Sequence, residues 1–133
     1  MSPGNEVRPA PRRSDSADPA VPPFRITSRA IDRRLRELKV QGELDLAVAD
    51  RLKDGLSEAH GSGVLIDMSE CTLIDSAGVA TVLLARLDGE RIAIHSPSEP
   101  VRRILSLTGV TGEGLVFDGR EEAARSLLEP ADG

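Results

Sequence analysis

Aromatic side chains are almost absent from this chain of 133 residues: apart from two histidines, only Phe24 and Phe117 are aromatic. Proteins that bind single-stranded nucleic acid stack the bases on aromatic rings, so this composition argues against that class. A net charge of -5 gives no electrostatic attraction to nucleic acid or to an anionic membrane. We therefore expect no nucleic acid and no membrane among its direct partners.

Long apolar runs and multiple cysteines are missing as well. No stretch approaches the roughly 20 apolar residues that cross a bilayer, and the N-terminus lacks the apolar segment of a signal peptide. Cys71 is the single cysteine, which excludes an internal disulfide and is most simply read as a small packing residue. These absences predict a cytoplasmic protein.

The prolines are concentrated near the N-terminus. Six of the nine lie within residues 1–23, where Ser, Asp, Arg and Gly make up most of the rest. Such a segment has too little to bury to offset its ordering entropy, so we predict a disordered tail over residues 1–23. We expect a folded domain over residues 24–128 and a short C-terminal tail over residues 129–133.

Hydrophobic periodicity divides the folded part into alternating strands and helices. The predicted strands cover residues 24–29, 34–41, 64–67, 91–95 and 115–117. The second of them is ambiguous, because Ile31, Leu35 and Leu38 have helical spacing whereas Leu38 and Val40 have strand spacing. We predict a strand there, paired antiparallel with the first.

Four helices are expected, and each has a residue suited to open it. These residues are Asp45, Asp75, Ser98 and Asp118, the last paired with Glu121 in a capping box. The predicted buried face of the helix after Asp75 consists of Val79, Ala80, Leu83, Leu84 and Leu87. The repeated strand–helix units predict an α/β fold with a mainly parallel sheet of four to five strands, an antiparallel edge strand and about four helices.

The pair Asp75-Ser76 is placed where a loop is expected to enter a helix. If Asp75 is the N-cap, Ser76 is the first helical residue, and the amides of Ser76, Ala77 and Gly78 lack intrahelical partners. A phosphate on Ser76 would then lie beside the positive end of the helix, which the fold should tolerate. The alternative interpretation is that Asp75 and Ser76 only cap the helix.

Three motifs follow one another at characteristic spacing: Gly42-Glu43-Leu44-Asp45-Leu46, Val64-Leu65-Ile66-Asp67-Met68-Ser69 and Ile74-Asp75-Ser76-Ala77-Gly78-Val79. Over about residues 24–128 the chain resembles the STAS domain, and more narrowly the anti-sigma factor antagonists of bacterial partner-switching pathways. The resemblance implies a STAS-like fold and a role in transcription regulation and stress response.

The resemblance also implies a cycle in which the serine matching Ser76 is phosphorylated. The partner would be an anti-sigma factor with serine kinase activity. The unphosphorylated protein would bind this kinase and free the sigma factor, phosphorylation on Ser76 would abolish binding, and a phosphatase would reset the cycle. Many relatives carry Ser or Thr where this chain has Ala77, so a single phosphorylation position is expected at the motif.

We predict that the partner contacts this helix and the segment Gly42–Asp45. The expected contact residues are Glu43, Asp45, Asp75, Ser76, Ala77, Gly78, Thr81 and Val82. Gly78 would allow close approach of another backbone, and Asp75 would orient the serine hydroxyl. Packing against a neighbouring helix explains the small residues equally well, and capping explains Asp75 equally well.

Features of an enzyme are not found in the sequence. No Gly-x-Ser-x-Gly elbow surrounds Ser76, no Walker-type phosphate loop occurs, and two histidines with one cysteine lack metal-site spacing. We expect no enzyme activity, no cofactor and no metal, so that ATP must come with the partner. Two other hypotheses are a STAS interaction or ligand-sensing module without phosphorylation, and a serine hydrolase in which His60 or His95 approaches Ser76.

Overall fold

The computed structural model describes residues 23–110 and 114–129. Within them, the strands and helices are β2 (Arg25–Ala30), β3 (Leu35–Leu44), α2 (Ala49–Glu58), β4 (Gly63–Ile74), α3 (Ser76–Leu87), β5 (Arg91–His95), α4 (Glu99–Leu107), β6 (Val116–Phe117) and α5 (Arg120–Leu128). The strand order is β2-β3-β4-β5-β6, with β2 antiparallel to β3 and the other neighbours parallel. The predicted α/β fold with an antiparallel edge strand is confirmed. The tails predicted at residues 1–23 and 129–133 lie almost entirely outside the described residues.

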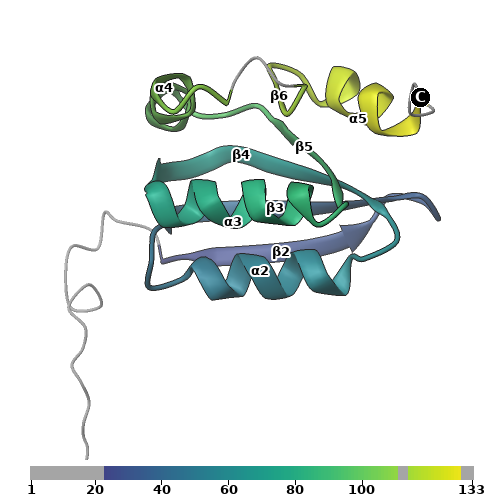
Figure 1. Cartoon of the computed structure of the whole chain (residues 1–133), viewed down its shortest axis with the longest axis horizontal. Coiled ribbons are helices and arrows are strands. Elements are labelled where there is room, and N and C mark those ends of the chain that lie inside the picture. Colours follow the sequence, from purple (N-terminus) through teal and green to yellow (C-terminus); the bar gives the residue numbers. More distant parts are fainter. Residues whose placement is uncertain (1–22, 111–113, 130–133) are drawn as a thin grey trace, which may run out of the picture.

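Helices pack on both faces of this sheet (Figure 1). Because side chains alternate between the two faces of a strand, each face has its own hydrophobic cluster. The larger cluster joins the sheet to α2, α3 and α4, with Leu52 and Val101 among its buried residues. The smaller cluster joins β3, β4 and β5 to α5 through residues such as Leu65 and Leu127.

The ambiguous second segment is a strand, as predicted. β3 begins at Leu35 and pairs antiparallel with β2, so that Ile26 lies opposite Val40. The turn between the two strands is held by Asp32, whose carboxylate accepts hydrogen bonds from the amides of Arg34 (2.7 Å) and Leu35 (3.0 Å). This local side-chain bond favours a tight turn over a continuing helix.

The strand before the serine motif is longer than predicted. The sequence indicates a strand over residues 64–67, whereas β4 continues to Ile74. Beyond Asp67 it no longer pairs with β5 and instead follows β3 through two register shifts. Residues 69–72 are mostly polar and show no alternation, which hides this extension in the sequence. The motif residue Ile74 therefore belongs to a strand, and the prediction of a loop before the helix is wrong.

The helix predicted to open at Asp45 begins later. α2 starts at Ala49, and Asp45 forms the preceding turn, in which its carboxylate accepts a hydrogen bond from the Ala47 amide at 3.0 Å. A carboxylate that bonds to its own backbone two residues later is typical of a turn. Asp45 thus shapes the connection between β3 and α2 without capping the helix.

The last two helix starts agree with the sequence to different degrees. Ser98 is the N-cap residue of α4 as expected, but its hydroxyl donates to a backbone carbonyl of β4 and makes no capping bond. For α5 the N-cap residue is Gly119, so the predicted capping box of Asp118 and Glu121 is wrong. The Asp118 carboxylate instead forms an ion pair with Arg102 on α4 at 2.7 Å.

Candidate functional site

Ser76 is the first residue of α3 and is exposed. The chain reaches it directly from β4, with only Asp75 between the strand and the helix. Within the described residues the Ser76 hydroxyl makes no hydrogen bond to another group. A free hydroxyl at this position is accessible to a modifying enzyme.

Asp75 caps the helix and also fastens a neighbouring loop. Its Oδ1 accepts hydrogen bonds from the amides of Ala77 (3.0 Å) and Gly78 (3.1 Å), and its Oδ2 accepts one from Leu46 (3.1 Å). Two of the three helix amides that the sequence left unpartnered are therefore already satisfied. A phosphate on Ser76 would meet the negative charge of Asp75 and would extend toward solvent without binding these amides.

Gly78 is buried and lies against the ends of β3 and β4. A Cβ atom there would be 2.9 Å from Leu44 Cγ, 2.9 Å from Ile74 Cγ1 and 3.0 Å from the Leu44 carbonyl oxygen. These contacts are too short for any side chain larger than hydrogen. Within the chain, Gly78 thus makes a close approach to the protein's own strands β3 and β4.

We expect Gly78→Ala to destabilise the protein by about 1–2 kcal/mol, because overpacking against a backbone carbonyl outweighs the gain in helix propensity. Gly55→Ala on α2 is the matched control, since its Cβ would meet only Leu38 side-chain atoms at 3.4 Å and 3.7 Å. That control should be neutral or stabilising. Urea denaturation of both variants measures the difference, and equal stability of the two would contradict the packing described for Gly78.

The predicted orientation of α3 is wrong in part. Val79 is buried as expected, but Ala80, Leu84 and Leu87 are exposed, and Val82 is buried in their place. The helix is apolar on nearly every side, so its periodicity does not determine which line of residues faces the sheet. Its orientation is set by the Asp75 cap and by the close contact at Gly78, neither of which the periodicity reveals.

This orientation changes the predicted partner surface. Gly78 and Val82 are buried and cannot contact a partner without rearrangement of the helix. Ala77 and Thr81 remain partly exposed, and the Thr81 hydroxyl donates to the Ala77 carbonyl oxygen at 2.9 Å. Glu43 and Asp45 lie at the adjoining end of β3, Glu43 exposed and Asp45 partly exposed.

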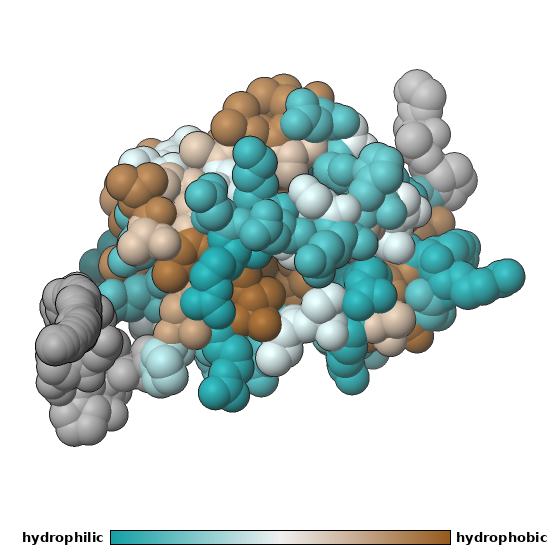
Figure 2. Space-filling view, turned by 90° about the horizontal axis from the view of Figure 1, so that it is seen from below, coloured by the Kyte–Doolittle hydropathy of each residue, from teal (hydrophilic) through white to brown (hydrophobic). Residues whose placement is uncertain are grey.

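A groove between α2 and α3 begins beside the serine, and we call it the α2–α3 groove. Its volume is about 520 Å³. Much of its lining is apolar, including Leu46, Ala49, Leu56, Ala77, Ala80 and Leu84. Leu46 and Leu84 are 77% and 60% exposed, which is unusual for large apolar side chains. Figure 2, which views the molecule from the α2 side, shows apolar surface in patches between hydrophilic side chains.

The rim of the α2–α3 groove carries more negative than positive charge. Asp50, Asp88 and Glu90 line it together with one cation, Lys53. An apolar floor with an acidic rim suits a partner segment that presents apolar side chains flanked by basic ones. The sequence identified the serine end of this surface. It placed Leu84 on a buried face and did not single out Leu46, so it missed both exposed leucines.

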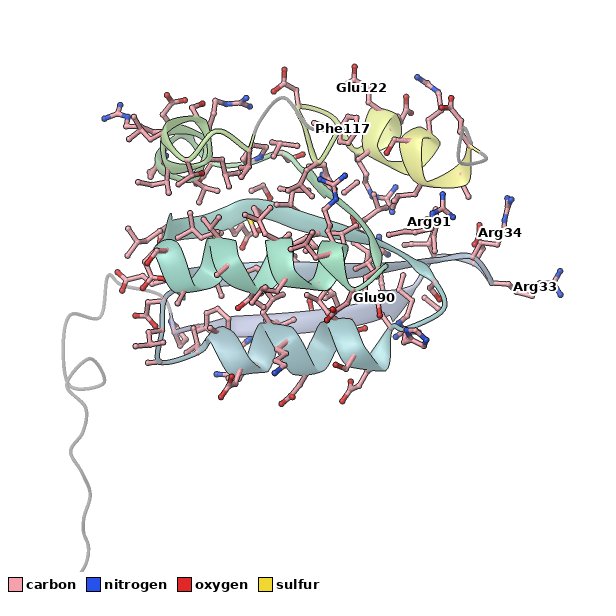
Figure 3. All side chains as sticks on the ribbon, viewed as in Figure 1. Arg33, Arg34, Glu90, Arg91, Phe117 and Glu122 are labelled. Carbon is pink, nitrogen blue, oxygen red and sulfur yellow. The ribbon has the colours of Figure 1, made fainter. Side chains whose placement is uncertain are left out.

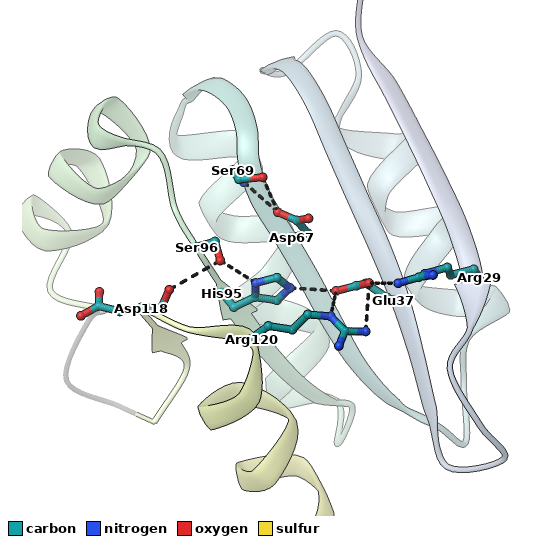
Figure 4. A network of polar contacts seen from close by, with 8 residues as sticks. All are labelled: Arg29, Glu37, Asp67, Ser69, His95, Ser96, Asp118 and Arg120. Atoms are coloured by element: carbon teal, nitrogen blue, oxygen red, sulfur yellow. Dashed lines mark hydrogen bonds and ion pairs between the residues drawn. The ribbon is translucent and has the colours of Figure 1, made fainter.

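A second polar feature missed by the sequence is a buried network on the α5 side of the sheet (Figure 4). Glu37 on β3 is only 7% exposed. Its carboxylate accepts hydrogen bonds from His95 Nε2 (2.8 Å), Arg120 Nε (2.9 Å) and Arg29 Nη2 (3.1 Å). Burial raises the pKa of Glu37, but the bonds from Arg120, His95 and Arg29 outweigh burial and lower this pKa from 4.5 to about 2.

Three residues in this region are close enough to bind one metal ion together. The metal-binding atoms of Glu37, Asp67 and His95 lie within 4.8 Å of one another. However, Arg29 and Arg120 both form ion pairs with Glu37, so a cation would have to compete with two arginines for that carboxylate. The arrangement fits an internal ion-pair network better than a metal centre.

The candidate catalytic residues are engaged elsewhere. His60 is exposed and pairs with Glu90 at 2.7 Å, while His95 belongs to the buried network. Cys71 is buried, which raises the pKa of its thiol to about 11, and its sulfur donates to the Leu73 carbonyl oxygen. These contacts assign the two histidines and the cysteine to structure. Within the described residues, no helix is both long and apolar enough to cross a membrane.

The chain and its fold are similar to those of several known proteins. A family model described as "Mlab, STAS domain" matches residues 28–117. An anti-sigma factor antagonist from Mycobacterium paratuberculosis is similar in structure, with a TM-score of 0.70 at 15% identity over 80% of this chain and 96% of that one. The Bacillus cell fate determinant SpoIIAA in its phosphorylated form gives 0.59 at 19% identity, over 79% of this chain and all of that one.

The same fold also occurs in another class of protein. A sulfate transporter family protein from Wolinella succinogenes gives a TM-score of 0.59 at 21% identity, over 74% of this chain and 88% of that one. At these identities the similarity establishes the fold alone. The function has to be argued from the residues around Ser76.

Proposed function

The chain belongs to the STAS domain family, and on that premise we propose that it is an anti-sigma factor antagonist controlled by phosphorylation of Ser76. The unphosphorylated chain binds an anti-sigma factor that has serine kinase activity and thereby frees a sigma factor. The kinase transfers a phosphate from ATP to Ser76, the modified chain dissociates, and a phosphatase restores it. In this scheme the chain is a binding module and performs no catalysis.

The observation that carries this proposal is the position of one free hydroxyl beside an apolar groove. Ser76 is exposed, and its neighbour Ala77 lines the α2–α3 groove. A partner bound in the groove would therefore reach over Ser76. The likeness to a Bacillus protein solved in its phosphorylated form and to a mycobacterial anti-sigma factor antagonist supports the same assignment.

Electrostatics explain how one phosphate would separate the two states. A phosphoserine adds about -1.5 to -2 charges at neutral pH. In the free chain this charge is solvated, because Ser76 is exposed. In the complex the same charge would be covered by the partner beside the carboxylate of Asp75, where desolvation and like-charge repulsion both oppose binding. Phosphorylation should therefore change the stability of the free chain little and weaken partner binding strongly.

A second function is favoured by the likeness to the sulfate transporter family protein. In that case the chain would be an interaction module of another complex, and its α2–α3 groove would bind a partner without any change at Ser76. The two functions share the groove and differ only in phosphorylation. They are separated by the experiment that follows.

Incubation with the cognate anti-sigma factor kinase and ATP should add a single phosphate to the wild-type chain, measured by intact-protein mass spectrometry. Ser76→Ala should abolish this phosphate, because Ala77 leaves no second hydroxyl in the motif. Ser69→Ala is the matched control: Ser69 is also exposed, but it lies on β4 and its hydroxyl is bonded to the Asp67 carboxylate at 2.8 Å. That variant should be phosphorylated like the wild type.

Two outcomes would count against the proposal. Phosphorylation that persists in Ser76→Ala would place the modification elsewhere. Stable binding of the kinase with no phosphate added to the wild-type chain would favour the interaction module instead. Thermal denaturation of each variant first shows whether it is folded, so that either outcome can be interpreted.

A further inference from the structure

We propose that a second cleft, at the end of the sheet opposite Ser76, binds a small phosphate-bearing anion such as pyrophosphate. The cleft has a volume of about 270 Å³ and lies where β3, β4 and β5 begin. Three arginines contribute to its lining: Arg33, Arg34 and Arg91. We call it the arginine cleft.

The arginines that line this cleft come from segments far apart in the sequence. Arg33 and Arg34 belong to the turn between β2 and β3, and Arg91 is the first residue of β5 (Figure 3). Arg91 is held in place because its Nη2 donates to the carbonyl oxygen of Leu127 at the end of α5. Carbonyl groups orient this guanidinium but bring no net charge to neutralise it.

Positive charge is in excess in the arginine cleft. Among residues 23–110 and 114–129, no carboxylate forms an ion pair with Arg33, Arg34 or Arg91. Glu90 is the single carboxylate in the lining, and it already pairs with His60 at 2.7 Å. The lining contains three exposed arginines and one carboxylate, on a chain whose net charge is -5. Such a local reversal of sign favours an anionic ligand.

The shape and the donors of the cleft indicate which anion fits. Guanidinium groups bind phosphate oxygens through two parallel hydrogen bonds, so clustered arginines suit a phosphate group well. A volume of about 270 Å³ is slightly below that of most sites for larger ligands. A hollow between three loops suits a small molecule, whereas a membrane or a nucleic acid needs an extended surface. Gly61 and Gly89 in the lining have open space around them, so the cleft is not obstructed there.

The arginine cleft lies far from Ser76, although Glu90 lines both this cleft and the α2–α3 groove. β4 runs from Gly63 in this cleft to Ile74 next to the serine motif, which separates the two by roughly 35 Å at the rise of an extended strand. Binding here does not depend on phosphorylation of Ser76. This proposal can therefore be tested independently of the proposed function.

Calorimetric titration of the full chain with pyrophosphate at low ionic strength tests the proposal. We expect saturable binding at one site, weakened about tenfold by Arg34→Gln through loss of a charge-assisted contact. Glu90→Gln should strengthen binding, because it removes the negative charge from the lining. Arg103→Gln is the matched control, since Arg103 is an exposed residue of α4 that does not line the cleft.

Absence of saturable pyrophosphate binding to the folded wild-type chain would overturn the proposal. Equal weakening by Arg34→Gln and Arg103→Gln would also overturn it, because the attraction would then be general and not local. Retention on phosphatidylglycerol vesicles without pyrophosphate binding would assign the arginines to a lipid surface. Thermal denaturation of each variant without ligand confirms that it is folded.

Discussion

Replacing Ser76 by glutamate is expected to weaken binding of the anti-sigma factor kinase several-hundred-fold, whereas Ser76→Gln should bind nearly as well as the wild type. The two side chains have almost the same size and differ in charge. The comparison therefore separates electrostatic repulsion from steric obstruction. Isothermal titration calorimetry with the purified kinase, without ATP, measures both affinities.

The size of this effect follows from the surroundings of the serine. Ser76 is followed by Ala77 in the apolar α2–α3 groove and preceded by the carboxylate of Asp75. A carboxylate placed there is solvated in the free chain but loses water when a partner covers the groove. A penalty of about 3–4 kcal/mol corresponds to several-hundred-fold weaker binding, because each 1.4 kcal/mol is a factor of ten.

A control for the added charge is available on another helix. Ser106 is an exposed residue of α4 and does not line the α2–α3 groove. Ser106→Glu makes the same change in net charge and should leave kinase binding unaltered. If Ser76→Glu bound as tightly as Ser76→Gln, the proposed switch would be wrong, and the proposal that the groove is the interface would be unaffected.

The order of strands and helices could be predicted because each segment has a hydrophobic pattern in its own sequence. The isoleucines of β5, and Val101 and Leu105 on one face of α4, are buried as the pattern of each segment predicts. The end of β4 could not be predicted in this way. Its residues 69–72 are polar, and they extend the strand because β3 offers backbone partners to them.

The candidate site was only partly predictable for a related reason. Asp75 and Ser76 were identified from their order and from the family resemblance, and capping by Asp75 is confirmed by its bonds to two amides. The exposed side of α3 was not identified. Its sequence allows more than one buried face, and the choice depends on Gly78 meeting Leu44, a contact between distant segments.

No pattern in the local sequence predicts the buried network around Glu37. Glu37 lies next to Leu38 in a strand and has the pattern of an exposed residue on a half-buried sheet. Its partners His95 and Arg120 are 58 and 83 residues further along the chain. Only the fold brings these charges together, so this buried ion-pair network could not be found from spacing.

That contact leads to the second large expected effect, a loss of stability in acid. The pKa of Glu37 is about 2 in the folded chain against 4.5 for an unperturbed glutamate. Between these values the unfolded chain binds more protons, so stability falls as pH decreases from about 4.5 toward about 2. At 1.36 kcal/mol per pKa unit, the contribution present at neutral pH is roughly 3 kcal/mol.

We expect Glu37→Gln to remove most of this contribution at pH 7 and to flatten the decline below pH 4.5 that the wild type shows. Glutamine keeps the shape of the side chain but leaves His95 buried and Arg120 without a charge partner. Glu70→Gln is the matched control, because Glu70 is exposed and its pairing with Lys39 at 2.9 Å contributes little in water. Urea denaturation of the three proteins at a series of pH values measures the free energies of unfolding. A Glu37→Gln variant that lost stability in acid as steeply as the wild type would show that other carboxylates govern the transition, and that the network holds α5 to the sheet more weakly than its distances indicate.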